Sequence, residues 1–306
     1  MDKRTNQTTP ISQLIADSIP EVPTRPRKPS TYDYLKKTNP EHNLVVEYDK
    51  NMKIYDDYYA KQRVETPKKE PVVIPDLHPI HSQSFYNLFK FYYQKINNCE
   101  FNENANNKEA YYFAKTLIYY FSKDENFLKS PLLSNINNIS MDKGLLVIGG
   151  FGCGKTSIFK TMHQLFFNAQ RESIPVYDVE KNIQSLARYK MQFKYFTANQ
   201  VVEEYESCEN PGEKEYFWNR QNKGFTYYDD ILTEREASNY GKVEIFKDIF
   251  EKRYSDNAKT MISCNYYGDT VETTLAEFGK KYGGRVYDRL FSMFNIIELK
   301  GKSLRK

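Results

Sequence analysis

Cysteines are few in this sequence, long apolar runs are missing, and no charge of one sign dominates. None of the four cysteines belongs to a CxxC pair, which argues against a disulfide framework or a zinc cluster and favours a reducing compartment. The longest wholly apolar run, near residues 145–148, is too short for a transmembrane helix. The N-terminal residues lack the apolar core of a secretory signal. We therefore expect a cytoplasmic protein with no membrane partner.

The charge is unevenly distributed, although the net charge of +4 is too small to identify nucleic-acid binding. Residues 280–306 contain eight Lys or Arg and only two acids. Such a basic tract can contact the phosphates of a nucleotide or of DNA. It can equally be a solvated tail, and charge alone does not choose between the two interpretations.

The composition changes along the chain and predicts three regions. Residues 1–75 hold nine of the 13 prolines, and we expect an extended, largely disordered arm with short helices near 11–18 and 49–63. Residues 76–140 are expected to form a small helical region, because apolar side chains recur there at helical spacing. A Ser- and Asn-rich link near residue 140 separates this region from residues 141–306.

Residues 141–306 alternate between short apolar runs and amphipathic segments. The apolar runs predict strands at 144–150, 194–198, 224–230, 260–265 and 295–301. The segments between them are long enough to be helices. This alternation predicts an α/β fold, with a parallel sheet flanked by helices on both faces.

A phosphate-binding loop follows the first of these strands. Gly149, Gly154, Lys155 and Thr156 fit the pattern G-x-x-x-x-G-K-[ST], with a strand before it and a helix after it. Backbone N–H groups of such a loop bind phosphate oxygens, the lysine reaches the β and γ phosphates, and the threonine hydroxyl binds Mg²⁺. We therefore predict ATP and Mg²⁺ as cofactors, and as binding residues Gly149, Gly150, Phe151, Gly152, Cys153, Gly154, Lys155, Thr156 and Ser157.

Polar side chains end two of the later strands. Asp229 and Asp230 close the strand at 224–230, and Asn265 closes the strand at 260–265. In a parallel sheet these ends lie at the edge that carries the phosphate loop. We expect Asp229 to hold Mg²⁺ through a water, Asp230 to polarise the attacking water, and Asn265 to orient it. Alternatively, the two acids only cap a helix.

The order of motifs resembles that of bacterial helicase loaders, which are AAA+ ATPases of the DnaC/DnaI type related to the transposase helper IstB. The motifs are the phosphate loop followed by DDILTE (229–234), ISCN (262–265), GGRVYDRL (283–290) and GKSLR (301–305). The resemblance covers residues 142–306, and the first 140 residues do not visibly match. It implies an AAA+ sheet without a C-terminal lid domain.

The resemblance also implies roles for single residues. Asp229 and Asp230 match the Walker B pair, and because that family often has Glu at the second position, hydrolysis is expected to be slow. Asn265 matches the sensor I position. Arg289 matches an arginine finger that reaches the ATP of a neighbouring subunit, and Arg285 is the alternate candidate for this role. Arg305 matches the sensor II position.

The implied function is ATP-dependent loading of a replicative helicase onto single-stranded DNA. The implied assembly is a homo-oligomer whose active sites are shared between subunits. One alternative is an IstB-like transposition helper, which has the same ATPase core. A second alternative is a nucleotide-gated DNA-binding adaptor with little turnover.

Overall fold

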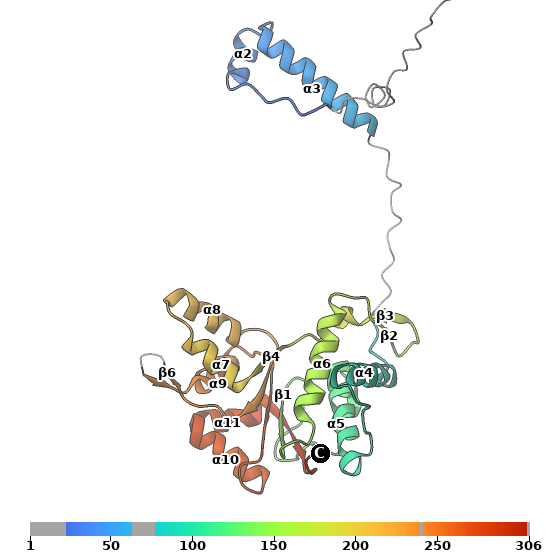
Figure 1. Ribbon diagram of the computed structural model, residues 1–306, viewed down its shortest axis with the longest axis vertical. Coiled ribbons are helices and arrows are strands. Elements are labelled where there is room, and N and C mark those ends of the chain that lie inside the picture. The colour runs from blue at the N-terminus through green and yellow to red at the C-terminus, as the bar shows by residue number, and fades with distance from the viewer. Residues whose placement is uncertain (1–22, 63–76, 239–240, 305–306) are drawn as a thin grey trace, which may run out of the picture. The chain divides into compact units, whose positions relative to one another are not determined.

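The computed structural model describes residues 23–62, 77–238 and 241–304. The chain forms two units that divide between Pro75 and Asp76 (Figure 1). Within the described residues, no helix is both long enough and apolar enough to span a membrane.

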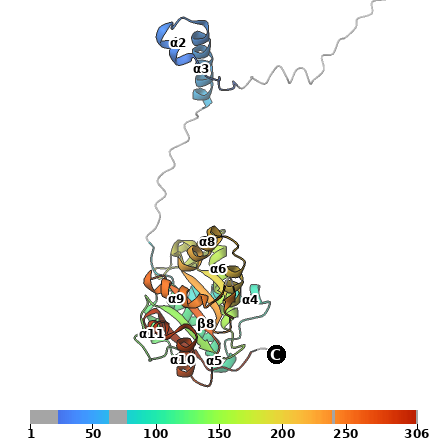
Figure 2. The same ribbon diagram turned by 90° about the vertical axis from the view of Figure 1, so that its left-hand side faces the viewer.

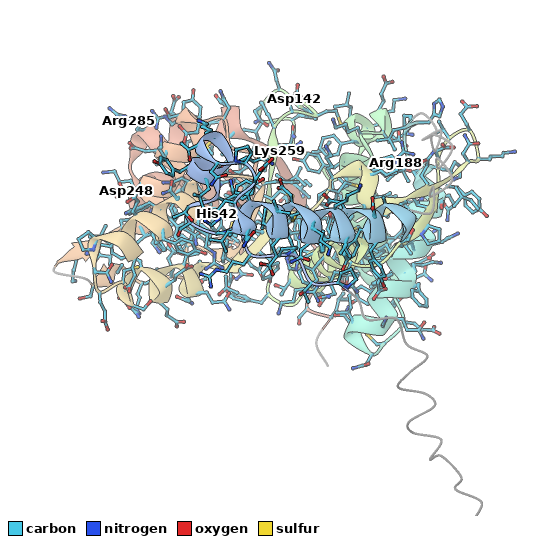
Figure 3. The ribbon with its side chains drawn as sticks, turned by 90° about the horizontal axis from the view of Figure 1, so that it is seen from above. His42, Asp142, Arg188, Asp248, Lys259 and Arg285 are labelled. Carbon is cyan, nitrogen blue, oxygen red and sulfur yellow. The ribbon has the colours of Figure 1, made fainter. Side chains whose placement is uncertain are left out.

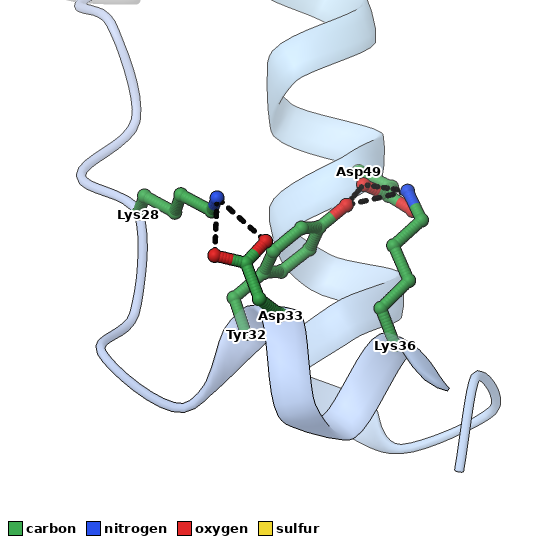
Figure 4. A network of polar contacts seen from close by, with 5 residues as sticks. All are labelled: Lys28, Tyr32, Asp33, Lys36 and Asp49. Atoms are coloured by element: carbon green, nitrogen blue, oxygen red, sulfur yellow. Dashed lines mark hydrogen bonds and ion pairs between the residues drawn. The ribbon is translucent and has the colours of Figure 1, made fainter. Parts of the chain in front are cut away.

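Within its described residues, 23–62, the first unit contains two helices, α2 (Tyr32–Thr38) and α3 (Asn43–Gln62). The Tyr32 side chain is buried, and Asp49 accepts hydrogen bonds from its hydroxyl at 2.5 Å and from Lys36 at 3.0 Å (Figure 4). These two donors lower the pKa of Asp49, the tyrosine contributing most.

The extended conformation predicted for the arm is therefore wrong for residues 32–38 and 43–48, which are helical. The prolines that prompted it leave residues 41–66 without one, so a long helix can form there. The helix expected at 49–63 begins earlier, at Asn43. The helix expected near 11–18 lies outside the described residues.

The second unit begins with helices and continues as alternating strands and helices. Its helices are α4 (Ser82–Asn97), α5 (Ala105–Ser122), α6 (Lys155–Ala169), α7 (Ala198–Glu206), α8 (Pro211–Asn222), α9 (Ile245–Ser255), α10 (Val271–Tyr282) and α11 (Gly284–Met293). Its strands are β1 (Gly144–Gly149), β2 (Pro175–Tyr177), β3 (Ile183–Ser185), β4 (Lys194–Thr197), β5 (Thr226–Ile231), β6 (Ala237–Ser238), β7 (Lys242–Val243), β8 (Thr260–Cys264) and β9 (Phe294–Leu299). Short 3-10 helices lie at Glu125–Lys129 and Leu186–Tyr189.

Five strands form one sheet in the order β4-β5-β8-β1-β9, and every neighbouring pair is parallel. The predicted α/β fold with a parallel sheet flanked by helices is confirmed. Strand β8 lies between β1, which leads into the phosphate loop, and β5, which carries the two acids. The residue that follows β8 therefore lies between the loop and the acids.

Alternate side chains of β1 enter two separate cores. Leu145 and Val147 belong to the core shared with α4, α5 and α6, whereas Leu146 and Ile148 belong to the core on the other face, with α7 to α11. Figure 1 shows these two helical layers on opposite sides of the sheet, and Figure 2 shows α10 beside α11. The helical region at 77–140 thus packs as part of the sheet's own unit.

The sequence patterns missed α8 and the β2–β3 hairpin. Helix α8 is mostly polar, so its apolar periodicity is weak. A start signal was nevertheless present, because Asn210 caps the helix through its side chain and Pro211 occupies its first turn.

Candidate nucleotide-binding site

The phosphate loop connects the carboxyl end of β1 to the first turn of α6. Gly152 and Gly154 have φ values of 73° and 99°, which other residues adopt only with strain. Gly149 is required for a different reason. A Cβ at this position would lie 2.8 Å from Cβ of Leu299 on the neighbouring strand β9. Glycines at these positions thus permit both the tight turn and the close packing of the strands.

Lys155 is the first residue of α6, and its ammonium lies inside the loop. Nζ donates to the carbonyl oxygens of Gly149 at 2.6 Å and Gly150 at 3.0 Å. It also donates to Oδ1 of Asn265 at 3.1 Å. The residue is only 7% exposed. A buried cation at a helix N-terminus, where backbone N–H groups are also unpaired, favours an anionic ligand.

Asn265 links this lysine to the acid at the end of β5. Its amide nitrogen donates to Oδ1 of Asp230 at 2.6 Å, while its amide oxygen accepts from Lys155. The three side chains come from elements next to one another in the sheet order, as predicted from the strand ends. The structure therefore brings together three of the predicted site residues.

Asp230 occupies an unusual backbone position. Its φ is 64°, and the pairing register between β5 and β8 shifts between Tyr228 and Ile231. The register shift separates Asp230 from the regular ladder of the sheet. Burial, and secondly the charge of Asp229, raise the pKa of Asp230, whereas Lys155 lowers it. An acid with a raised pKa is a better proton acceptor than an ordinary aspartate.

Asp229 is held differently from Asp230. Its side chain is buried, and Oδ1 accepts from the hydroxyls of Tyr227 at 2.7 Å and Ser263 at 2.6 Å. Oδ2 accepts from the hydroxyl of Tyr195 at 2.6 Å. No motif in the sequence indicates these three hydroxyl groups. They lie on three neighbouring strands, so only strand order and register could have revealed them.

A cavity of about 460 Å³ opens over the loop. It is lined by Tyr93, Phe151, Gly152, Cys153, Gly154, Lys155, Thr156, Ser157, Asp230, Asn265 and Leu304. The predicted loop residues from 151 to 157 all line it. Tyr93 on α4 and Leu304 after β9 were missed, because neither lies in a phosphate-binding motif. The volume and the cationic, glycine-rich lining are compatible with a nucleotide and its metal ion.

The two candidate arginine fingers lie on α11, outside this cavity's lining in the part of the chain that is described. The guanidinium of Arg289 lies 4.6 Å from the ring centroid of Tyr254, and Nη1 of Arg285 lies 3.8 Å from Oε2 of Glu251. The Arg285 side chain is 71% exposed, and Figure 3 labels it. Both partners belong to α9. The sensor II candidate, Arg305, lies outside the described residues.

Neither a scan against models of protein families nor a search among curated proteins finds a match. The structure is similar to a number of solved structures, among them the following three. The DnaC helicase loader is 19% identical, with a TM-score of 0.38 over 52% of this chain and 79% of that one. DnaI is 15% identical, with a TM-score of 0.37 over 62% and 82%.

The third similar structure is AMPPCP-bound DnaA from Aquifex aeolicus, at 15% identity, with a TM-score of 0.34 over 56% of this chain and 44% of that one. The resemblance to DnaC and DnaI that the sequence motifs predicted is thus also found between the structures. The P-loop α/β fold itself is seen directly in the parallel strand order and the phosphate loop.

Proposed function

We propose that the chain is an ATP-dependent switch that loads a replicative helicase onto single-stranded DNA. The observation that supports its nucleotide chemistry is the convergence of Lys155, Asn265 and Asp230 at the phosphate loop. The helicase and the DNA are proposed from the order of the sequence motifs. The proposal therefore has two parts, which are tested separately.

The residues of the loop would bind the phosphates. Lys155 exchanges its carbonyl partners for phosphate oxygens, and the backbone N–H groups at the start of α6 donate to the same oxygens. Thr156 supplies a hydroxyl ligand for Mg²⁺, which when bound offsets the negative charge of the phosphates. Asn265 and Asp230 hold the attacking water, and Asp230 accepts its proton.

Asp229 retains the metal role that was predicted for it, through a bridging water. From the described residues its Oδ2 accepts one hydrogen bond, donated by Tyr195, and a carboxylate oxygen can accept two. The three hydroxyls fix the orientation of this buried carboxylate. Asp229 would therefore bind the metal ion through a water, while Asp230 would accept the proton of the attacking water.

Arg289 would complete the site of a neighbouring subunit, with Arg285 supporting the interface. Among the described residues, neither guanidinium is tied to a buried partner, since Arg289 lies against the Tyr254 ring and Arg285 pairs with an incompletely buried Glu251. A guanidinium on α11 is therefore available to an anionic group on another subunit. ATP binding would favour assembly and DNA binding, and hydrolysis would reverse both.

The nucleotide part is tested by titrating a fluorescent ATP analogue into the parent, Lys155→Ala and Lys160→Ala. We expect Lys155→Ala to lose measurable binding, because the phosphates lose their closest cation. Lys160→Ala, which removes a lysine from the same helix away from the loop, is the matched control and should bind like the parent. Equal affinity in all three proteins would refute the nucleotide site.

The partner is tested by co-purification with the replicative helicase of the same organism, with and without ATP. We expect ATP-dependent retention of the helicase and a turnover that changes when single-stranded DNA is added. The Asp at position 230 also supports the nucleotide-gated adaptor with little turnover. Tight ATP binding without turnover, with or without DNA, would favour the adaptor over the loader.

A further inference from the structure

The segment that follows β9 runs back to the phosphate loop. The backbone N–H of Leu304 donates to the carbonyl oxygen of Gly152 at 2.9 Å. The Leu304 side chain lines the nucleotide cavity, and its Cδ1 lies 3.8 Å from the Cβ position of Gly154. Residues 300–304 thus form a strap, and its end is one wall of the cavity.

The first turns of α5 hold the beginning of this strap. The two carboxylate oxygens of Glu109 accept the backbone N–H groups of Lys300 at 2.6 Å and Gly301 at 2.7 Å. The side-chain amide of Asn106 donates to the carbonyl oxygen of Lys302 at 2.8 Å. Three consecutive residues of the strap are therefore bonded by two side chains. Hydrogen bonds to an ionised carboxylate are among the stronger kinds in proteins.

The side chains of Asn106 and Glu109 lie so close to Gly301 that a Cβ at this position would displace their ends. A Cβ on Gly301 would lie 2.3 Å from Nδ2 of Asn106 and 2.4 Å from Oε2 of Glu109. Contacts this short force the neighbouring atoms apart. The φ of Gly301 is not in the left-handed region, so close approach explains the glycine here and backbone freedom does not.

The backbone of α5 is unusual at the same place. Asn106, Asn107 and Lys108 have φ values of 51°, 55° and 70°. Consecutive left-handed residues are costly for L-amino acids, and asparagine tolerates this conformation best. Backbone strain of this kind persists where the surrounding structure enforces it, and it is common at functional positions. Here the strained residues include Asn106, which binds the strap, and directly precede Glu109, which also binds it.

We propose that Glu109 is a positioning residue for the nucleotide site, acting through the strap. By clamping Lys300 and Gly301, it holds Leu304 against Gly152 and so maintains one wall of the cavity. The helical region before the sheet thereby controls the affinity of the phosphate loop. This inference rests on the proposed binding of ATP at that loop.

The test compares the parent with Glu109→Ala, Gly301→Ala and Glu103→Ala. We call the contact of Glu109 with the backbone of Lys300 and Gly301 the clamp. The first two variants each break it, one by removing the carboxylate and the other by adding a Cβ at residue 301. Glu103, which pairs with Lys90 just before α5, is the control acid. Hydrogen exchange at the amides of residues 300–304 reports on the clamp, and titration of a fluorescent ATP analogue reports on the site. Melting temperatures show whether each variant is folded.

We expect faster exchange at the amides of residues 300 and 301 and roughly tenfold weaker ATP binding in both Glu109→Ala and Gly301→Ala, and parental values in Glu103→Ala. The double variant Glu109→Ala/Gly301→Ala should lose less than the product of the two single losses, because both act on one contact. ATP should slow exchange at Leu304 in the parent and do so less in the variants. If Glu109 only stabilised the end of β9, ATP would slow exchange at Leu304 equally in the parent and in the variants.

Parental ATP affinity in both clamp variants, with faster exchange at residues 300–301, would overturn the inference and leave the proposed function intact. A parent that does not bind ATP would refute the proposed function first. If Glu109→Ala does not fold, Gly301→Ala decides, since it retains the carboxylate.

Discussion

The ammonium of Lys155 lies 3.1 Å from Oδ1 of Asn265, and the amide nitrogen of the same asparagine lies 2.6 Å from Oδ1 of Asp230. One amide therefore connects the cation of the phosphate loop with the acid of β5. If a phosphate binds Lys155, Asn265 would lose its hydrogen bond from this lysine and keep its hydrogen bond to Asp230. Binding of a phosphate at the loop would therefore change the hydrogen bonding of the amide that contacts Asp230.

This relationship predicts separate effects on binding and turnover. Asn265→Ala should bind ATP within a few-fold of the parent, because Lys155 remains. Its ATP turnover should fall by about 10²-fold, as is typical when one oriented donor is removed from a reaction centre. Asn199→Ala, an exposed asparagine in α7, is the control. If Asn265→Ala lost ATP binding to the same extent as turnover, the prediction that the two effects are separate would be wrong.

The two acids should respond differently to amide substitution. Asp230→Asn should retain ATP binding and lose hydrolysis, since the proton acceptor at the cavity is gone. Asp229→Asn should weaken Mg²⁺-dependent binding and also lower the melting temperature, because an amide cannot accept from three hydroxyls as the carboxylate does. The measurements are turnover, binding with and without Mg²⁺, and thermal unfolding, with Asp256→Asn as the exposed control.

Normal turnover in Asp230→Asn would transfer the role of base to another acid. Glu234, the last residue of the DDILTE motif, is the next acid along the chain. The structure buries its side chain completely in an ion pair with Lys281 at 2.7 Å, so it is a poor replacement.

Mixing two inactive proteins tests whether sites are shared between subunits. Arg289→Ala should bind ATP almost normally and lose ATP-dependent assembly and turnover, by about 10³-fold if it acts as an arginine finger. Lys155→Ala should be inactive for lack of nucleotide. Together they can form interfaces in which an intact loop meets an intact arginine, so part of the activity should return. Arg285→Ala should show a milder loss.

No recovery on mixing two folded proteins would place Arg289 elsewhere. Arg289, which lies against Tyr254, would then belong to a basic surface that contacts DNA.

The ion pair between Glu234 and Lys281 joins the segment after β5 to the end of α10. Glu234 also accepts from the hydroxyl of Tyr282 at 2.5 Å. Lys281→Met leaves a buried carboxylate without its cation, and we expect it to lower the free energy of unfolding by about 3–5 kcal/mol. Urea denaturation measures this loss. Lys280→Met, next to it but 70% exposed, should change stability by less than about 1 kcal/mol.

Glu244 should make stability depend on pH. Burial, opposed by Lys281 and reinforced by Glu234 and Glu236, raises its pKa from 4.5 to about 7. The folded chain therefore binds a proton more tightly than the unfolded chain, so stability should fall as the pH rises from 4.5 to 7 and then level off. Glu244→Gln should flatten this part of the melting-temperature profile, and Glu215→Gln, exposed on α8, should not.

Local patterns in the sequence determined the type of fold and the chemistry of the loop. The glycines and Lys155 follow from the needs of a phosphate-binding turn, and the alternation of apolar runs with helical segments required a parallel sheet. These features depend on neighbours within a few residues, so the sequence displays them directly. The extended arm was predicted less well, because proline content described only part of residues 1–75.

Tertiary structure alone decided which distant side chains meet. The strand order placed Ser263 and Tyr195 on opposite sides of Asp229, and the register shift in β5 turned Asp230 toward Asn265. Similarly, nothing near Glu109 in the sequence indicates that it binds the backbone after β9. Such contacts depend on how strands are ordered and how closely segments pack, and a single sequence does not encode either in a local pattern.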